Sequence, residues 1–171
     1  MIFLTVGTQF PFDRLVRAVD SVLDEGLIDE EVFAQIGETS YKPHNFESVA
    51  SLEKRLFDKR LKEASAMIGH AGMGTITLAL ENGKPLLVMP RLKKYREVVN
   101  DHQLAIARKF EAYGHVLVAY HEKDLPDKAG QLKGFVPTKR RTQVEEVARR
   151  VSTFLDGLCE SGQNLPGKGN C

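Results

Sequence analysis

The sequence predicts an α/β fold, a single Rossmann-like domain in which helices cover both faces of a parallel sheet. Short apolar runs, rich in β-branched residues, recur along the chain at 2–6, 31–37, 66–69, 86–89 and 115–119. Segments with apolar residues at helical spacing lie between or after these runs, at 12–23, 52–64, 75–82, 101–113 and 142–158. Strands separated by helices of this length form right-handed βαβ units, and therefore a doubly wound parallel sheet.

Glycine and proline residues mark the limits of the predicted elements in the first half of the chain. Gly7 ends the first strand, and Gly26 ends the amphipathic helix that follows it. After the second strand, a polar, irregular segment contains Pro43 and a brief predicted strand near 46–50. The charged segment 52–64 is amphipathic, so we expect a helix with one face packed on the sheet.

The second half of the chain continues the same alternation. Gly83 can adopt the left-handed backbone conformation that is common just after the end of a helix, here the third one. Pro90 ends the strand that comes next. We expect the amphipathic helix at 142–158 to pack on the sheet of its own chain, and packing on a partner protein is the alternative. The residues beyond it are rich in Gly and Asn, so we expect one domain over 1–158 and a flexible tail over 159–171.

The composition restricts the class of protein. With 171 residues, 42% of them hydrophobic, the chain is long enough for one well-buried domain. A formal net charge of +1 argues against a broad surface for nucleic acid. Cys159 and Cys171 are too few for a disulfide framework, and no closely spaced Cys and His residues indicate a metal. The N-terminus does not resemble a signal peptide and no apolar run is long enough to span a bilayer, so we expect a cytoplasmic protein.

In doubly wound folds, ligands bind at the carboxyl ends of the strands. Three loops are expected there, at 7–12, 69–75 and 90–103. The first begins with Gly7 and Thr8, whose amides and hydroxyl would face the same crevice. Gly7 alone is better explained as a residue that ends a strand.

The loop between the fourth strand and its helix, GHAGMGT, is the strongest indication of a ligand. Gly72 and Gly74 allow a phosphate to approach the backbone closely. The free amides and the dipole of the following helix favour an anion there, and Thr75 adds a hydroxyl. His70 precedes the turn, where a diphosphate would lie. The loop matches neither the Walker pattern nor G-x-G-x-x-G, and a glycine-rich turn without a ligand is the alternative.

The third loop combines basic and polar residues. Its basic part, 91–96, would face anionic lipid or a partner, although a charged run is more often a solvated surface. Its polar end, Asp101, His102 and Gln103, is suited to grasping sugar hydroxyls. The alternative is that Asp101 caps the helix and His102 lies on the surface.

Four segments together resemble a known family. GTQFPFDRL at 7–15, GHAGMGTI at 69–76, GKPLLVMPR at 83–91 and NDHQ at 100–103 resemble the C-terminal, donor-binding domain of family 28 glycosyltransferases, which have the GT-B fold. The chain looks most like the small subunits of two-part transferases. These include the donor-binding subunit of the eukaryotic lipid-linked N-acetylglucosaminyltransferase. The residues of the motifs are most similar to those of the bacterial capsular and exopolysaccharide transferases.

The resemblance implies a role for each motif residue. The donor would be a UDP-sugar, and His70 would help to stabilise charge on the departing UDP. The donor-binding residues would be Gly7, Thr8, Gly72, Gly74 and Thr75 at the diphosphate, with Asp101, His102 and Gln103 at the sugar. The family commonly inverts the anomeric carbon without a metal or other cofactor, and we expect the same here.

Two positions limit what the resemblance implies. Many members carry an acidic residue that binds the ribose at the position of Leu78, and Glu81 is not the matching residue. No general base is assigned, because Asp13, the acidic residue after the first loop, is better explained as stabilising the start of a helix.

The resemblance covers only half of a GT-B enzyme. We therefore expect a membrane-associated, acceptor-binding partner subunit that recruits this chain to the inner face of the membrane. The expected reaction is transfer of a hexose to a lipid-linked, polyprenyl-diphosphate saccharide in polysaccharide biosynthesis. A non-catalytic nucleotide-sugar-binding or regulatory subunit is the alternative, and a sugar-nucleotide 2-epimerase is disfavoured because those enzymes carry both domains in one chain.

Overall fold

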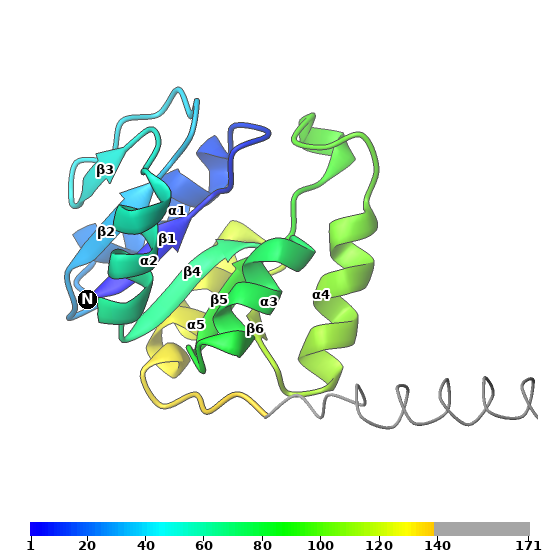
Figure 1. Cartoon of the computed structure of the whole chain (residues 1–171). Helices are drawn as coiled ribbons and strands as arrows, with labels where there is room; N and C mark the ends of the chain where they lie inside the picture. Colours follow the sequence, from blue (N-terminus) through cyan, green and yellow to red (C-terminus); the bar gives the residue numbers. More distant parts are fainter. Residues whose placement is uncertain (139–171) are drawn as a thin grey trace, which may run out of the picture. The chain divides into compact units, whose positions relative to one another are not determined.

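A computed structural model describes residues 1–138 of the chain. Six strands form one sheet in the order β3-β2-β1-β4-β5-β6, and every neighbouring pair is parallel (Figure 1). The strands are β1 (Ile2–Thr5), β2 (Val32–Gln35), β3 (Glu47–Val49), β4 (Ala66–His70), β5 (Leu86–Met89) and β6 (Leu117–Val118). The predicted parallel α/β sheet is confirmed.

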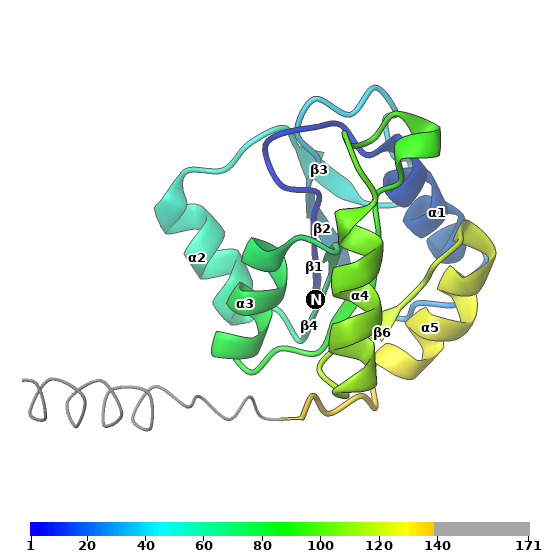
Figure 2. The same ribbon diagram turned by 90° about the vertical axis from the view of Figure 1, so that its right-hand side faces the viewer.

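Helices cover both faces of the sheet, as Figures 1 and 2 show. One face carries α1 (Asp13–Asp24) and α5 (Leu125–Leu132), and the other carries α2 (Lys54–Glu63), α3 (Met73–Glu81) and α4 (His102–Ala112). Within residues 1–138, no helix is long and apolar enough to cross a membrane.

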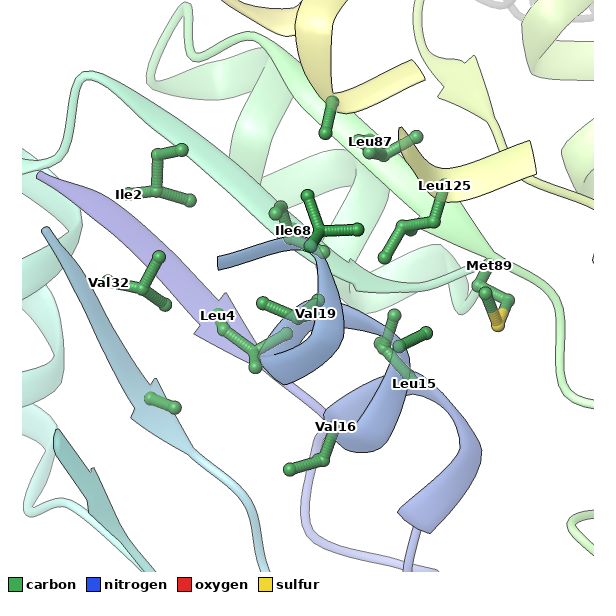
Figure 3. Packing of buried hydrophobic residues seen from close by; sticks show 14 of the residues in the cluster. Ile2, Leu4, Leu15, Val16, Val19, Val32, Ile68, Leu87, Met89 and Leu125 are labelled. Atoms are coloured by element: carbon green, nitrogen blue, oxygen red, sulfur yellow. The ribbon is translucent and has the colours of Figure 1, made fainter. Parts of the chain in front are cut away.

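The core therefore has two layers, one on each face of the sheet. Leu4 and Ile68 pack with Leu15 and Val19 of α1, and Figure 3 shows these side chains together. Phe3, next to Leu4 along β1, joins the cluster on the opposite face, because successive side chains of a strand point to opposite sides. Each such fully buried side chain contributes roughly 1.5–3 kcal/mol relative to an exposed one.

Most predicted elements are confirmed within one or two residues, and the differences have local causes. Helix α3 begins at Met73, two residues before its predicted start. The prediction began the helix after Gly74 because glycine has a low helix propensity, but Gly74 belongs to the first turn. Strand β6 has only two residues. Helix α5 and two 3-10 turns, η1 (Lys93–Tyr95) and η2 (Glu122–Asp124), were not predicted. The predicted helix at 142–158 and the predicted tail at 159–171 lie outside the described residues.

The carboxyl ends of β1, β4 and β5 lie side by side at one edge of the sheet. Thr5 pairs in register with Gly69, and Gly69 pairs with Val88. The loops after these three strands therefore leave the sheet at nearly the same level. This places the three loops that the sequence indicated around one point.

Candidate functional site

A cleft of about 480 Å³ lies where the three loops meet. It is lined by Thr5, Val6, Gly7, Thr8, Gln9 and Phe10 from the end of β1 and its loop, by His70, Gly72, Met73, Gly74, Thr75 and Leu78 from β4 and α3, and by Arg91, Val98, Gln103, Gln35 and Phe57. Most of these residues belong to the loops predicted from the sequence.

His70 lies at the end of β4, with its imidazole enclosed by two glycine backbones. A Cβ atom added to Gly7 would be 2.8 Å from Nε2 of His70, and one added to Gly72 would overlap Cε1. Gly7 also has a φ of 76°, which favours glycine in any case. The two glycines thus make room for the imidazole as well as for a ligand.

Two side chains hold the imidazole of His70. Its Nε2 is 3.0 Å from the hydroxyl of Thr75, and its Nδ1 is 3.4 Å from Nε2 of Gln103. Burial and, second, the charge of Arg91 lower the pKa of His70 to about 4. His70 is therefore neutral at pH 7.

The amino end of α3 faces the cleft. Gly72 is the N-cap residue, so the amides of Met73, Gly74 and Thr75 have no partner within the helix. A Cβ atom at Gly74 would meet nothing within 4 Å, which leaves its backbone open on that side. Free amides together with the helix dipole form a site for an anion.

Arg91 is a site residue that the sequence analysis placed in an exposed basic loop, and this placement is wrong. Its side chain is 2% exposed, because Nη2 donates to the carbonyl oxygens of Val6 at 2.7 Å and Phe10 at 2.5 Å. Its Nε is buried without a hydrogen-bond partner among the described residues. Burial lowers the pKa of Arg91 to about 10, and the charge of Glu97 partly offsets this, so the guanidinium stays charged at pH 7.

A second arginine stabilises the loop after β5, and the sequence did not indicate it. Arg14 of α1 forms two hydrogen bonds with the carboxylate of Glu97, at 2.8 and 2.9 Å, and donates to the carbonyl of Pro90. Glu97 in turn accepts a hydrogen bond from the amide of Leu92. The only indication in the sequence is that Glu97 is an acidic residue beside a basic loop. Its partner, Arg14, becomes evident only when the fold brings α1 next to this loop.

The structure brings seven of the nine predicted site residues to the cleft and leaves two outside its lining. Those at the cleft are Gly7, Thr8, His70, Gly72, Gly74, Thr75 and Gln103. Asp101 precedes α4 and its carboxylate accepts a hydrogen bond from the amide of Lys93. His102 is exposed at the first position of α4. Asp101 occupies the N-cap position of α4, but its side chain makes no capping hydrogen bond, so only the surface position of His102 agrees with the alternative given above.

Two further expectations concern residues near the cleft. Leu78, where the resemblance to family 28 implied an acidic residue in many members, lines the cleft and gives it an apolar wall together with Phe57. Asp13 accepts a hydrogen bond from the amide of Tyr41 at 2.6 Å, so it ties the start of α1 to the loop after β2. The observed hydrogen bond is to this loop, and α1 has no side-chain capping hydrogen bond at its start.

The combination of groups at this edge suits a ligand with a phosphate or diphosphate. The amides of α3, the hydroxyl of Thr75 and the charge of Arg91 all favour an anion. Within residues 1–138, no three His, Cys, Asp or Glu side chains are grouped so that they could hold a metal ion.

Comparison with known proteins agrees with this description. Residues 1–134 match the glycosyltransferase family 28 C-terminal domain. The chain is 35% identical over 166 residues to the human UDP-N-acetylglucosamine transferase subunit ALG13, covering 92% of this chain and 14% of that protein. It is 38% identical over 102 residues to the subunit of the same name from Eremothecium gossypii, covering 60% of this chain and 44% of that protein. It thus spans less than half the length of these curated relatives.

Solved structures show the same fold. A solution structure of ALG13 has a TM-score of 0.56 at 19% identity and covers 85% of this chain and 93% of that one. The crystal structure of Acinetobacter baumannii MurG has a TM-score of 0.53 at 22% identity, covering 76% of this chain and 39% of that one. The fold corresponds to the C-terminal half of GT-B glycosyltransferases. The chain belongs to the glycosyltransferase family 28 C-terminal domain family.

Proposed function

We propose that this chain is the donor-binding, catalytic subunit of a two-part inverting glycosyltransferase that transfers a sugar from UDP to a lipid-linked saccharide. One observation carries the proposal: the free amides of α3, the neutral His70 and the buried charge of Arg91 converge on one cleft. Membership of family 28 and the names of the curated relatives, which are transferase subunits, support it.

The proposed chemistry is electrostatic. Charge develops on the diphosphate as the bond to the sugar breaks, and Gly72, Gly74 and Thr75 would stabilise it through amides and a hydroxyl held in place beforehand. Thr8 and Gly7 would contact the phosphates from the opposite loop. His70, which lies between these two loops, would help to stabilise the charge of the departing UDP. The general base is not assigned to any residue of this chain.

The sugar would be held at the start of α4. Gln103 lines the cleft, which supports the proposed contact. Asp101 and His102 remain predicted sugar contacts, and both would have to turn toward the cleft when the donor binds. Leu78 offers no carboxylate to the ribose, so other groups would recognise the nucleoside.

The identities of the sugar donor and of the acceptor are more specific proposals. The curated relatives are named for UDP-N-acetylglucosamine, which makes it the first donor to test. The bacterial character of the motifs favours a hexose for capsular or exopolysaccharide assembly, so UDP-glucose and UDP-galactose are the comparison. The acceptor site would belong to a membrane-associated partner subunit, which would hold this chain at the cytoplasmic face of the membrane.

The first prediction tests catalysis at His70. In the complex with the partner subunit, His70→Ala is expected to lower sugar transfer about 100-fold, because a preorganised group at the developing charge is lost. The measurement is transfer from radiolabelled UDP-sugar to lipid extract. His44→Ala is the matched control, since His44 is exposed and does not line the cleft.

Two results would separate the alternatives. Unchanged transfer by the His70→Ala complex, with UDP still bound, would favour the non-catalytic or regulatory subunit. A chain that shows no UDP-induced NMR shifts at 7–9 or 72–75, alone or in the complex, would contradict donor binding altogether.

A further inference from the structure

A chain of hydrogen bonds at the cleft links the loop after β5 to the start of α3. The amide of Arg91 donates to Oε1 of Gln103 at 3.1 Å. Nε2 of Gln103 lies 3.4 Å from Nδ1 of His70, and Nε2 of His70 lies 3.0 Å from the hydroxyl oxygen of Thr75. Arg91 lies in the loop after β5, Gln103 in α4, His70 at the end of β4 and Thr75 in the first turn of α3.

The direction of every bond in this chain follows from its first member. A backbone N–H can only donate, so the oxygen of the Gln103 side chain must face Arg91 and its NH₂ group must face His70. Nδ1 of His70 therefore accepts. A neutral imidazole carries one proton, which must then lie on Nε2 and is donated to the oxygen of Thr75.

The hydroxyl of Thr75 consequently keeps its own proton for another acceptor. Thr75 lies in the first turn of α3, next to the free amides, and lines the cleft. With the opposite tautomer of His70, Nε2 would be bare and the hydroxyl proton of Thr75 would be directed to it instead. The imidazole has little freedom to move away, since Gly7 and Gly72 enclose it.

We propose that Gln103 is a positioning residue that fixes the Nε2–H tautomer of His70, and thereby makes the hydroxyl of Thr75 a hydrogen-bond donor toward the diphosphate of the donor. This inference rests on the proposed function for its ligand. It assigns His70 an action through Thr75, and it gives Gln103 a task in addition to the predicted contact with the sugar.

The tautomer can be measured without any ligand. In the full chain labelled with ¹⁵N-histidine, two-bond ¹H–¹⁵N correlations of His70 at pH 7 are expected to show an unprotonated Nδ1 and a protonated Nε2. In Gln103→Glu the carboxylate can only accept, so Nδ1 is expected to become protonated. An unchanged amide spectrum away from the cleft is the control for folding. A protonated Nδ1 in the native chain, or a bare Nδ1 in Gln103→Glu, would overturn the inference.

UDP binding tests the second half of the inference. Thr75→Val, which keeps the shape of the side chain, is expected to weaken UDP binding about tenfold, and Thr75→Ser to restore it. Gln103→Met is expected to weaken binding less, and its effect should not add to that of Thr75→Val. Native-like UDP binding by Thr75→Val would overturn the donor role of Thr75. Absence of UDP binding by the native chain would overturn the proposed function, and the NMR result would still decide the tautomer.

Discussion

At the scale of single residues, the site depends on which groups are absent as much as on which are present. Gly72 has ordinary dihedral angles, φ −84° and ψ 144°, so its backbone does not require glycine. Only the space taken by the imidazole of His70 excludes a side chain there. Gly74, two residues later, has open space around it. The two glycines of one loop therefore have different functions.

This difference gives a matched pair of variants. Gly72→Ala is expected to displace the imidazole of His70 and to destabilise the protein by about 1–3 kcal/mol, as overpacking does. Gly74→Ala is expected to leave the His70 signals unchanged and to keep or slightly raise stability, because its methyl group meets no atom of the protein and alanine favours a helix more than glycine does. Urea unfolding and the imidazole ¹⁵N shifts measure both effects. Equal destabilisation by the two variants would contradict this interpretation.

At the scale of elements, a buried carboxylate on α1 fixes the loop between β2 and β3. Asp20, which is 3% exposed, accepts hydrogen bonds from the hydroxyl of Tyr41 and from the amides of His44 and Asn45. Burial alone would raise the pKa of Asp20, but these hydrogen bonds outweigh it and hold the pKa below its usual value.

The stabilisation by Asp20 should depend on pH in a defined direction. Because its folded pKa is lowered, its contribution is complete above the unfolded pKa of about 4 and is lost as the pH falls through the folded value. We expect Asp20→Asn to cost roughly 2–3 kcal/mol at pH 7 and much less near pH 2. Asp24→Asn, exposed one turn later on α1, should change stability by less than about 0.5 kcal/mol. A penalty independent of pH would contradict the assignment.

The elements also show how far the sequence could predict this structure. The buried strands and most helices follow from apolar periodicity alone, because burial on two faces leaves a strong pattern. Helix α5 does not, since it has only eight residues and contains Gly130, which disfavours a helix. Pro126 lies in its first turn, where proline is tolerated. The position of the helix is decided by packing against α1 and β5, through Leu125 and Ala129 among others.

The site was predictable where its chemistry is local. His70, Thr75 and the glycines lie within seven residues of sequence, so their loop and helix start could be inferred together. Arg91 could not be inferred, because the groups that bury it, the carbonyls of Val6 and Phe10, precede it by more than 80 residues. A cation in a basic run has the composition of a solvated surface, and only the contact of distant loops shows otherwise.

At the scale of the whole molecule, two arginines join the loops that form the cleft. Arg91 extends from the end of β5 to the loop after β1 and lies over the ring of Phe12, 5.0 Å from its centroid. Arg14 extends in the opposite sense, from α1 to Pro90 and Glu97. The net charge of the chain is only +1, so the positive character of the cleft must come from such placed groups.

Arg91 should therefore affect both stability and binding. Arg91→Met keeps much of the apolar stem but leaves two carbonyl groups without their donor, and we expect a loss of about 2–4 kcal/mol. We also expect UDP to bind at least tenfold more weakly, because a buried charge beside the anion is removed. Arg96→Met, in the same loop but exposed, is the control and should change neither quantity. A different result would contradict this interpretation: both variants weaken UDP binding equally, and the effect depends on salt. Exposed basic residues would then attract the anion, and buried Arg91 would serve only to join the loops.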